Sequence, residues 1–243
     1  MRNLIVDIGN TVAKLVVFEN SEPISEELTS NTALEALPDV VRTFGPARAV
    51  VSAVVELTAE AREALDALAM PVLYVTGQTP TPVPVLYRSP ATLGPDRLAA
   101  VVGAVTLQPG RPLLVVDAGT CVTYELVDAA GRYVGGNISP GLDMRLSALR
   151  EHTARLPLVA PMGDLPAMGY DTETAIRAGV VRGIQFEIEG YIRHYREKYP
   201  DLFVFLTGGN RLNFDTRLKN CIFADKYLVP RGLDRILEYN DHS

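Results

Sequence analysis

Two segments of the chain, 110 residues apart, combine an aspartate, a glycine and a threonine in a short turn. The first is Asp-Ile-Gly-Asn-Thr at 7–11 and the second is Asp-Ala-Gly-Thr at 117–120, and we call them the first and second aspartate turns. Glycine lets a phosphate approach backbone amides, and a threonine hydroxyl can donate to phosphate oxygens. The aspartate repels phosphate but can hold a cation that neutralises it. Two such turns predict an enzyme that clamps a nucleotide, although Asp-Gly turns are also common in plain β-hairpins.

The pattern around each aspartate turn predicts its place in the fold. An apolar run precedes the turn and alternating apolar residues follow it, so each turn is expected to join two strands. The expected strands are 3–8 and 12–18 for the first turn, and 113–117, 121–127 and 132–137 for the second. A third turn, Thr-Gly-Gly-Asn at 207–210, ends the apolar strand 202–207. Because ligands bind at strand ends in open α/β sheets, Gly208 and Gly209 are expected to form part of an adenosine wall.

A further group of reactive residues is Gly-Pro-Asp-Arg at 94–97. It follows a proline-rich stretch, 77–95, which is expected to be a stiff loop rather than regular structure. An aspartate at the start of a helix is most often only a cap. In this position, however, Asp96 could accept a hydroxyl proton during phosphoryl transfer. The adjacent Arg97 could bind a substrate carboxylate through two parallel hydrogen bonds.

The rest of the chain alternates strand and helix patterns. Strands 47–54 and 72–76 flank a helix 59–69 that Thr58 could cap, which indicates a βαβ unit with parallel strands. Further helices are expected at 96–107, in a segment that ends near 149, at 172–198 and at 233–239. Residues 19–30 form a polar stretch, and residues 153–170 are expected to be a mobile loop.

The long helix 172–198 carries two rows of residues. Its core face is predicted to consist of Ile176, Val180, Ile184, Ile188 and Ile192. A second row of small residues is formed by Ala175, Gly179 and Gly183. Each glycine inside a helix costs about 1 kcal/mol relative to alanine, so this row is expected to lie close to another backbone. That backbone could belong to the same chain or, as we favour, to a second copy in a dimer.

Composition limits the classes of protein. The chain has 243 residues, of which 47% are hydrophobic and 21% charged, as in a folded protein of one large or two small domains. The net charge of −6 argues against nucleic acid or an anionic membrane surface as a partner. Cys121, Cys221 and the histidines at 152, 194 and 242 lack the spacing of a zinc site or a catalytic triad. With no membrane-length apolar run and a strand pattern directly after Met1, we expect a cytoplasmic protein without a signal peptide.

Taken together, these motifs resemble those of the type III pantothenate kinases, also called the Bvg accessory factor family. Five motifs occur in order along almost the whole chain: 7–11, 94–97, 117–120, 135–141 and 207–209. The resemblance implies an α/β fold of the acetate-kinase, sugar-kinase and actin-like ATPase superfamily, with two similar ribonuclease-H-like halves, 1–112 and 113–243. It implies ATP-dependent phosphorylation of pantothenate to 4′-phosphopantothenate, the first step of coenzyme A biosynthesis. The implied cofactors are Mg²⁺ and a monovalent cation, K⁺ or NH₄⁺.

The resemblance also implies roles for individual residues. ATP would bind Asp7, Ile8, Gly9, Asn10, Thr11, Val12, Ala13, Lys14, Thr120, Gly208 and Gly209. Pantothenate would bind Tyr87, Gly94, Pro95, Asp96, Arg97 and Thr172. Asp7 would lie near Mg²⁺, Asp96 would be the general base, and Asp117 would help to bind the monovalent cation. Thr172 would reach pantothenate across the interface of a homodimer.

Several alternatives stay open at this point. Lys14 could be a solvated surface residue, and Tyr87 could serve only to pack its loop. Thr172 could be only a helix N-cap, and Asp117 could hold Mg²⁺ rather than K⁺. Pro95 stands where the family pattern has a small or aliphatic residue, which should stiffen the approach to Asp96. Another kinase or phosphatase of the superfamily, or a non-enzymatic transcription accessory factor, are the alternative functions.

Overall fold

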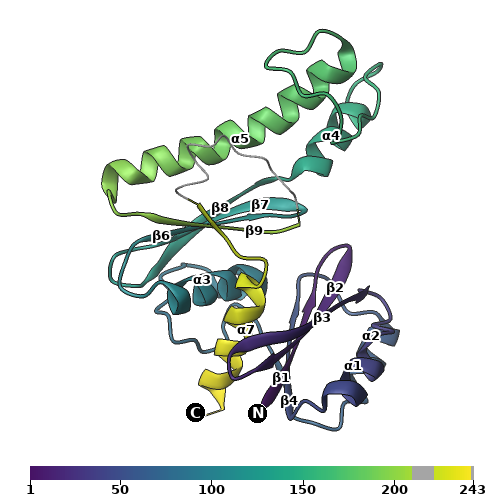
Figure 1. Ribbon diagram of the computed structural model, residues 1–243, viewed down its shortest axis with the longest axis vertical. Helices are drawn as coiled ribbons and strands as arrows, with labels where there is room; N and C mark the ends of the chain where they lie inside the picture. The colour runs from purple at the N-terminus through teal and green to yellow at the C-terminus, as the bar shows by residue number, and fades with distance from the viewer. Residues whose placement is uncertain (210–221, 242–243) are drawn as a thin grey trace. The chain divides into compact units, whose positions relative to one another are not determined.

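The computed structural model describes residues 1–209 and 222–241, so Asn210, Cys221 and His242 lie outside the described residues. The chain divides into two compact units (Figure 1). Unit 1 comprises Met1–Gly110, Ala130–Val134 and Tyr227–Ser243. Unit 2 comprises Arg111–Ala129 and Gly135–Lys226.

Unit 1 contains a five-stranded sheet in the order β3-β2-β1-β4-β5. Its strands are β1 (Arg2–Ile8), β2 (Val12–Glu19), β3 (Glu22–Ser30), β4 (Arg48–Ala53) and β5 (Val72–Tyr74). Its helices are α1 (Leu37–Phe44), α2 (Ala59–Asp66), α3 (Pro95–Leu107) and α7 (Leu228–Asn240), with a 3-10 turn at Pro90–Thr92. β1 pairs antiparallel with β2, whereas β1, β4 and β5 are parallel. The parallel pairing of β4 with β5 across α2 confirms the predicted βαβ unit.

Unit 2 is built on a second five-stranded sheet in the order β10-β9-β6-β7-β8. Its strands are β6 (Leu113–Ala118), β7 (Cys121–Val127), β8 (Tyr133–Pro140), β9 (Phe203–Thr207) and β10 (Ile222–Ala224). Its helices are α4 (Leu142–Glu151) and α5 (Thr172–Lys198). β6 pairs antiparallel with β7 and parallel with β9, which is parallel to β10.

The two sheets repeat one topology. In each sheet, the strand that comes first in the sequence is central. The next two strands in the sequence lie on one side of it, and the last two lie on the other side, parallel to the central strand. This repetition confirms the predicted α/β fold with two similar halves. The strands of the two sheets fall within 1–112 and 113–243, but α7 groups with unit 1. The division at residues 112 and 113 therefore stays a prediction as a domain boundary.

Most of the polar stretch at 19–30 forms the edge strand β3, which the sequence pattern did not indicate. Its glutamates alternate with few apolar residues, and its pairing with β2 depends on backbone hydrogen bonds rather than on burial. The short helix α1, which ends at Gly45 with a left-handed φ of 55°, was also not anticipated. Thr58 does cap α2, since its Oγ1 accepts a 3.1 Å hydrogen bond from the Ala61 amide.

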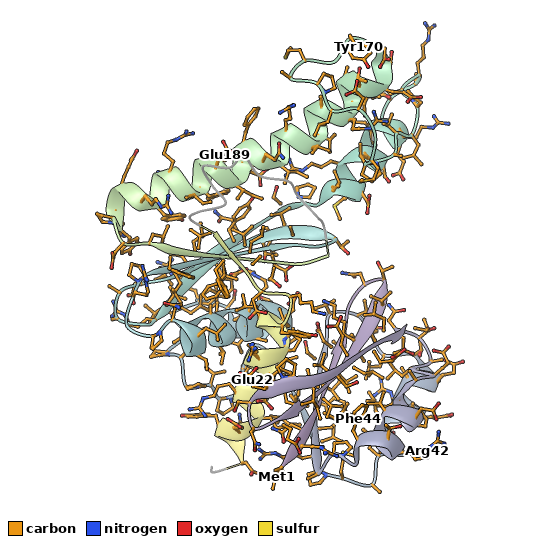
Figure 2. The ribbon with its side chains drawn as sticks, in the orientation of Figure 1. Met1, Glu22, Arg42, Phe44, Tyr170 and Glu189 are labelled. Carbon is orange, nitrogen blue, oxygen red and sulfur yellow. The ribbon has the colours of Figure 1, made fainter. Side chains whose placement is uncertain are left out.

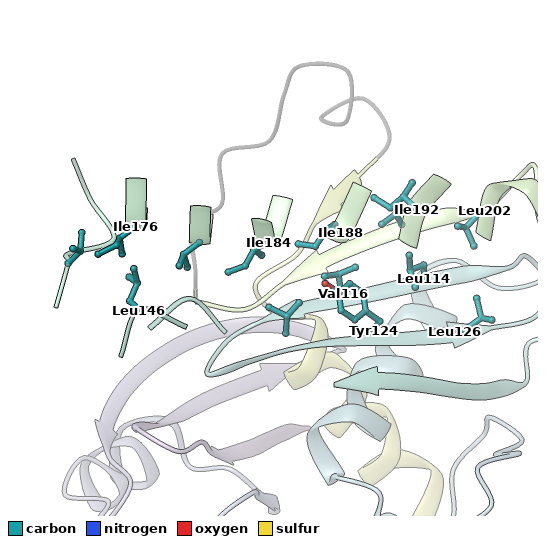
Figure 3. Close-up of a cluster of buried hydrophobic side chains, with 14 residues drawn as sticks. Leu114, Val116, Tyr124, Leu126, Leu146, Ile176, Ile184, Ile188, Ile192 and Leu202 are labelled. Carbon is teal, nitrogen blue, oxygen red and sulfur yellow. The ribbon is translucent and has the colours of Figure 1, made fainter. Parts of the chain in front are cut away.

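Helix α5 covers one face of the second sheet and supplies much of its core (Figure 3). The predicted core row, from Ile176 to Ile192, is buried against sheet residues such as Val116 and Tyr124. The second row behaves differently: a Cβ added at Gly179 or Gly183 would meet no atom within 4 Å. A neighbour within the described chain therefore explains neither of these two glycines, although Gly169 does lie close to the backbone of Ala175. Although α5 is 27 residues long, neither it nor another helix within the described ranges is apolar enough to cross a membrane.

Candidate active site

The first aspartate turn closes the hairpin of β1 and β2. Asp7 and Ile8 end β1, Gly9 to Thr11 form the turn, and Val12, Ala13 and Lys14 open β2. The Gly9 amide donates a 3.0 Å hydrogen bond to the Val12 carbonyl, which closes the turn tightly. Asn31 contributes from outside the motif: its Nδ2 donates 3.0 Å hydrogen bonds to the carbonyls of Gly9 and Asn10. Sequence reasoning missed Asn31, because it follows the unanticipated strand β3.

Asp7 lies in an electrostatic field set by two other predicted site residues. Burial raises the pKa of Asp7 to about 6. The ammonium of Lys14, its partner across the β1–β2 hairpin, lowers this pKa, while the carboxylate of Asp96 raises it further. The structure therefore brings Asp7, Lys14 and Asp96 together in unit 1. Lys14 is only partly exposed, unlike a fully solvated surface residue.

The Gly-Pro-Asp-Arg segment forms the start of α3. Gly94 is the N-cap residue and Pro95 the first helical residue, so Asp96 is not the cap itself. The Asp96 Oδ1 atom accepts a 2.8 Å hydrogen bond from the Arg97 amide, which fixes the carboxylate at the helix N-terminus. A Cβ on Gly94 would lie 2.4 Å from that same oxygen. Gly94 therefore leaves the room that the Asp96 carboxylate occupies.

Arg97 is held in an aromatic and polar environment within unit 1. Its side chain is buried, its Nη2 donates a 3.3 Å hydrogen bond to the Tyr133 hydroxyl, and its guanidinium lies 5.5 Å from the Tyr87 ring centroid. The rings of Tyr87 and Tyr133 stack with centroids 6.0 Å apart. The Tyr133 amide also donates to the Pro84 carbonyl, and the Tyr133 carbonyl accepts from the Leu86 amide. Tyr133, which sequence reasoning missed, thus orients both Arg97 and the loop that carries Tyr87.

The second aspartate turn belongs to unit 2, where it meets two other turns. Asp117 lies near the end of β6 and Thr120 is exposed in the following turn. Gly208 has a φ of +104°, and a Cβ there would lie 2.5 Å from the Ala118 carbonyl and 2.6 Å from the Asp117 Oδ1 atom. Only glycine fits so close to that carboxylate in this backbone conformation. A Cβ on Gly209 would meet no atom of the described residues within 4 Å.

Gly141 makes the third contact of this group of turns. Its amide donates a 3.0 Å hydrogen bond to the Thr120 carbonyl, and a Cβ there would lie 2.4 Å from the Gly119 carbonyl oxygen. The Gly-Gly motif at 135–141 does not form a turn along its whole length: residues 135–140 continue β8, and only Gly141 lies between that strand and α4, against the second aspartate turn. The contact joins segments 21 residues apart (120 to 141), which no local pattern encodes.

Thr172 lies in unit 2 as the first residue of α5, and it is exposed. The idea that Thr172 is the N-cap is wrong, because Asp171 takes that position. The Asp171 carboxylate accepts a 2.8 Å hydrogen bond from the Thr174 amide, which forms a capping box. The Thr172 hydroxyl is therefore not needed to cap the helix.

Comparisons with known proteins identify the family of the chain. The family model of type III pantothenate kinase matches residues 3–194. A Bacteroides fragilis type III pantothenate kinase is 53% identical over 239 residues, which cover 98% of both chains. A relative of the same name from Phocaeicola vulgatus is 51% identical and covers 98% of this chain and 99% of its own.

Solved structures support the fold independently. A Campylobacter jejuni protein described as a Baf family transcriptional activator superposes with a TM-score of 0.63 at 22% identity, covering 99% of this chain and all of its own. A Listeria monocytogenes protein described as an N-acetylmannosamine kinase gives a TM-score of 0.57 at 15% identity over 99% of this chain and 100% of its own. At such low identity these likenesses establish the shared fold alone. From its own sequence relatives, however, the chain belongs to the type III pantothenate kinase family.

Proposed function

We propose that the protein transfers the γ-phosphoryl group of ATP to the primary hydroxyl of pantothenate, with Asp96 as the general base. Membership of the family implies this reaction as the first step of coenzyme A biosynthesis. The observation that carries the assignment of roles is the juxtaposition of Asp96 with Asp7 and with the buried Arg97. This is a carboxylate pair next to a guanidinium, which suits an anionic substrate with a hydroxyl to activate.

In the proposed mechanism Asp96 orients the hydroxyl and takes its proton late, because an ordinary carboxylate is a weak base. Arg97 binds the pantothenate carboxylate, and the stacked Tyr87 and Tyr133 limit the directions in which the guanidinium can point. Thr172 would contact pantothenate from a second subunit. Catalysis by these residues consists of positioning and charge stabilisation, as for phosphoryl transfer in general.

The residues present fit Mg²⁺-ATP. When bound, it supplies the phosphoryl group and a divalent charge that neutralises the developing negative charge. Among the described residues no group of three His, Cys, Asp or Glu side chains could hold a metal ion. That agrees with Mg²⁺ held by one or two carboxylates together with substrate phosphates. Asp7 would hold the cation, Lys14 and residues 8–13 the phosphates, and Thr120, Gly208 and Gly209 the nucleotide.

The experiment that tests this function is an ADP-release assay with pantothenate, Mg²⁺-ATP and either K⁺ or Na⁺. We expect turnover that requires pantothenate and K⁺. At the Gly208 turn the Asp117 carboxylate lies close to backbone carbonyls, and oxygen atoms of this kind are hard ligands for a cation. NH₄⁺ should replace K⁺, and Asp117→Asn should raise the K⁺ concentration needed for half-maximal rate. Equal rates in K⁺ and Na⁺ would contradict the cation role alone.

The same assay distinguishes the alternative functions. Folded protein that hydrolyses ATP or phosphorylates a sugar, but not pantothenate, would point to another member of the superfamily. Folded protein that binds ATP without any transfer would favour a non-enzymatic accessory factor. The location of the protein in the cytoplasm stays a prediction.

A homodimer is the assembly we propose, with the open face of α5 as its centre. This open face consists of Ala175, Gly179, Gly183, Phe186 and Gly190. Cβ atoms added at its three glycines would meet no atom within 4 Å, and Phe186 is 63% exposed. The segment before α5 adds the exposed apolar side chains of Met162, Met168 and Tyr170 (Figure 2 shows Tyr170 on that segment). So much exposed apolar surface is typical of an interaction site.

We expect Phe186→Asp to convert the dimer to a monomer, since a charge at the centre of an apolar interface typically weakens association by about 100-fold or more. Light scattering after gel filtration at micromolar concentration measures the mass. Leu28→Asp is the matched control, because Leu28 is 55% exposed on β3 and lies outside the open face. A wild-type monomer, or a variant that stays dimeric, would rule out this interface.

A further inference from the structure

A polar cluster inside unit 2 connects α5 to the end of β8. Tyr124 on β7 donates a 2.7 Å hydrogen bond from its hydroxyl to Glu187 Oε1 on α5. Arg145 on α4 donates from Nη2 to Glu187 Oε2 at 2.6 Å and to Ser139 Oγ at 2.7 Å. The Tyr124 ring is buried and stacks on Tyr191, with centroids 4.0 Å apart. The cluster therefore joins β7, β8, α4 and α5 in one place.

The charges in this cluster are well defined. Burial acts to raise the pKa of Glu187, but hydrogen bonds from Arg145, Tyr124 and Ser139 outweigh it and hold the pKa below its usual value. Burial and the neighbouring Glu187 raise the pKa of Tyr124, so the phenol stays protonated and donates. Glu187 is thus an anion whose two oxygens accept from a cation and a phenol. Charge-assisted hydrogen bonds of this kind are about twice as strong as neutral ones, which makes the cluster stiff.

The cluster leads directly to the second aspartate turn. The Nε atom of Arg145 donates a 2.7 Å hydrogen bond to the carbonyl of Pro140, and the Arg145 amide donates to the Gly141 carbonyl at 3.0 Å. Gly141 in turn donates to Thr120 at 3.0 Å, and its backbone is so close that a Cβ would lie 2.3 Å from the Thr120 oxygen. Residues 140–141 cannot shift without moving the Thr120 backbone. The side chain of Arg145 therefore binds the segment that lies against the second aspartate turn.

We propose that Arg145 and Glu187 are positioning residues for nucleotide binding: they hold the 140–141 segment against Thr120 and so keep the second aspartate turn in its ATP-binding geometry. This inference rests on the proposed function only in that Thr120 and its turn contact ATP. It extends the site to two side chains that belong to none of the five sequence motifs and that contact no substrate in the proposed mechanism.

The test uses two single variants, Arg145→Lys and Glu187→Gln, and the double variant that combines them. Lysine keeps the charge but replaces a planar fork by a single ammonium, which cannot bond the Pro140 carbonyl, Ser139 and Glu187 together. We expect Kd and KM for ATP to rise by about 10- to 100-fold, because small displacements of a binding group cost that much. KM for pantothenate should stay within about twofold, since Asp96 and Arg97 lie on α3 in unit 1 and Thr172 lies 15 residues from Glu187 along α5. The double variant should be no worse than the more damaging single variant, because both changes break one network.

Arg111→Lys is the matched control for the arginine. Arg111 also donates from Nη2 to a backbone carbonyl, that of Asp201 at 2.7 Å, but it precedes β6 at the end away from Asp117. Glu189→Gln is the control for the glutamate, since Glu189 lies two residues further along α5 (Figure 2). Both controls should bind ATP like the wild type. If Arg145→Lys fails to fold, Glu187→Gln decides the question.

A fluorescent ATP analogue measures nucleotide binding without pantothenate, so the two proposals can fail separately. ATP affinity of Arg145→Lys and Glu187→Gln within about twofold of wild type, at unchanged melting temperature, would overturn the positioning role. Equal increases in KM for both substrates would also overturn it, because that indicates general damage. Wild-type protein that binds ATP but does not phosphorylate pantothenate would overturn only the proposed function. Wild-type protein that binds no ATP would overturn both.

Discussion

Replacing Asp96 by asparagine is expected to lower kcat for pantothenate by about 10²- to 10⁴-fold, the usual contribution of a general base. Asparagine has nearly the same shape and can still accept the 2.8 Å hydrogen bond from the Arg97 amide through its carbonyl oxygen. The start of α3 should therefore stay intact. What is lost is the negative charge and the ability to take the hydroxyl proton.

Steady-state kinetics with saturating Mg²⁺-ATP, combined with circular dichroism, measure this effect. Asp39→Asn is the matched control, because Asp39 is an exposed acidic residue in the first turn of α1 in the same unit. The control should keep wild-type turnover. Turnover of Asp96→Asn close to that of the wild type would remove Asp96 from its role as the base.

The second large effect is expected from Asp7→Asn, which should reduce activity and increase stability together. The folded protein holds the Asp7 pKa at about 6 instead of 3.8, so ionising this carboxyl opposes folding. Folded protein binds more protons than unfolded protein between these two values, hence wild-type stability falls as pH rises from about 4 to about 6. Asparagine removes that loss. The full shift of about 2 pKa units corresponds to about 3 kcal/mol, and the partial exposure of Asp7 makes the gain smaller.

The free energy of unfolding of both proteins, measured with urea at several pH values without Mg²⁺, tests the sign. The free energy of unfolding of Asp7→Asn should equal that of the wild type near pH 4. Its excess over the wild type should grow up to pH 6 and stay constant above that pH. Burial also raises the pKa of Asp234 to about 6. Subtracting the two curves removes the contribution of Asp234, because both proteins contain it. Activity should fall by about 10- to 100-fold or more, as is typical when a metal site loses a supporting carboxylate. A variant that is less stable than wild type at pH 7.5 would contradict this account.

The two results together would describe a trade between stability and function. Two carboxylates close enough to perturb each other are unfavourable in the free protein, because like charges repel. A bound divalent cation would relieve that repulsion. We therefore expect Mg²⁺-ATP to stabilise the wild type more than Asp7→Asn.

Much of the local structure follows from the sequence alone. The bounds of α5 were predicted at 172 and 198, because its apolar row repeats every four residues and its first turn carries capping residues. The strands around both aspartate turns were predicted from their apolar runs, and the glycines located both of these turns. These signals are local, since they depend on residues that are neighbours along the chain.

Other features depend on contacts between distant segments. The edge strand β3 has too few apolar residues to be recognised, and only its pairing with β2 makes it a strand. Helix α7 packs in unit 1, where Asp234 accepts a 2.6 Å hydrogen bond from Asn3 near the other end of the chain. Gly232 approaches so closely that a Cβ would lie 1.8 Å from the Ala99 carbonyl oxygen of α3. No periodicity in either segment specifies that meeting.

The candidate site shows the same division. The sequence by itself singled out the residues that we propose carry the chemistry, namely Asp7, Asp96, Arg97 and Asp117, because reactive side chains stand in short motifs. Only the tertiary structure decided what holds them. Tyr133 orients Arg97, Asn31 closes the first aspartate turn, and Arg145 with Glu187 supports the second through Gly141. Motifs encode the groups that react, whereas their supports come from elsewhere in the chain and are selected by packing and hydrogen bonding in three dimensions.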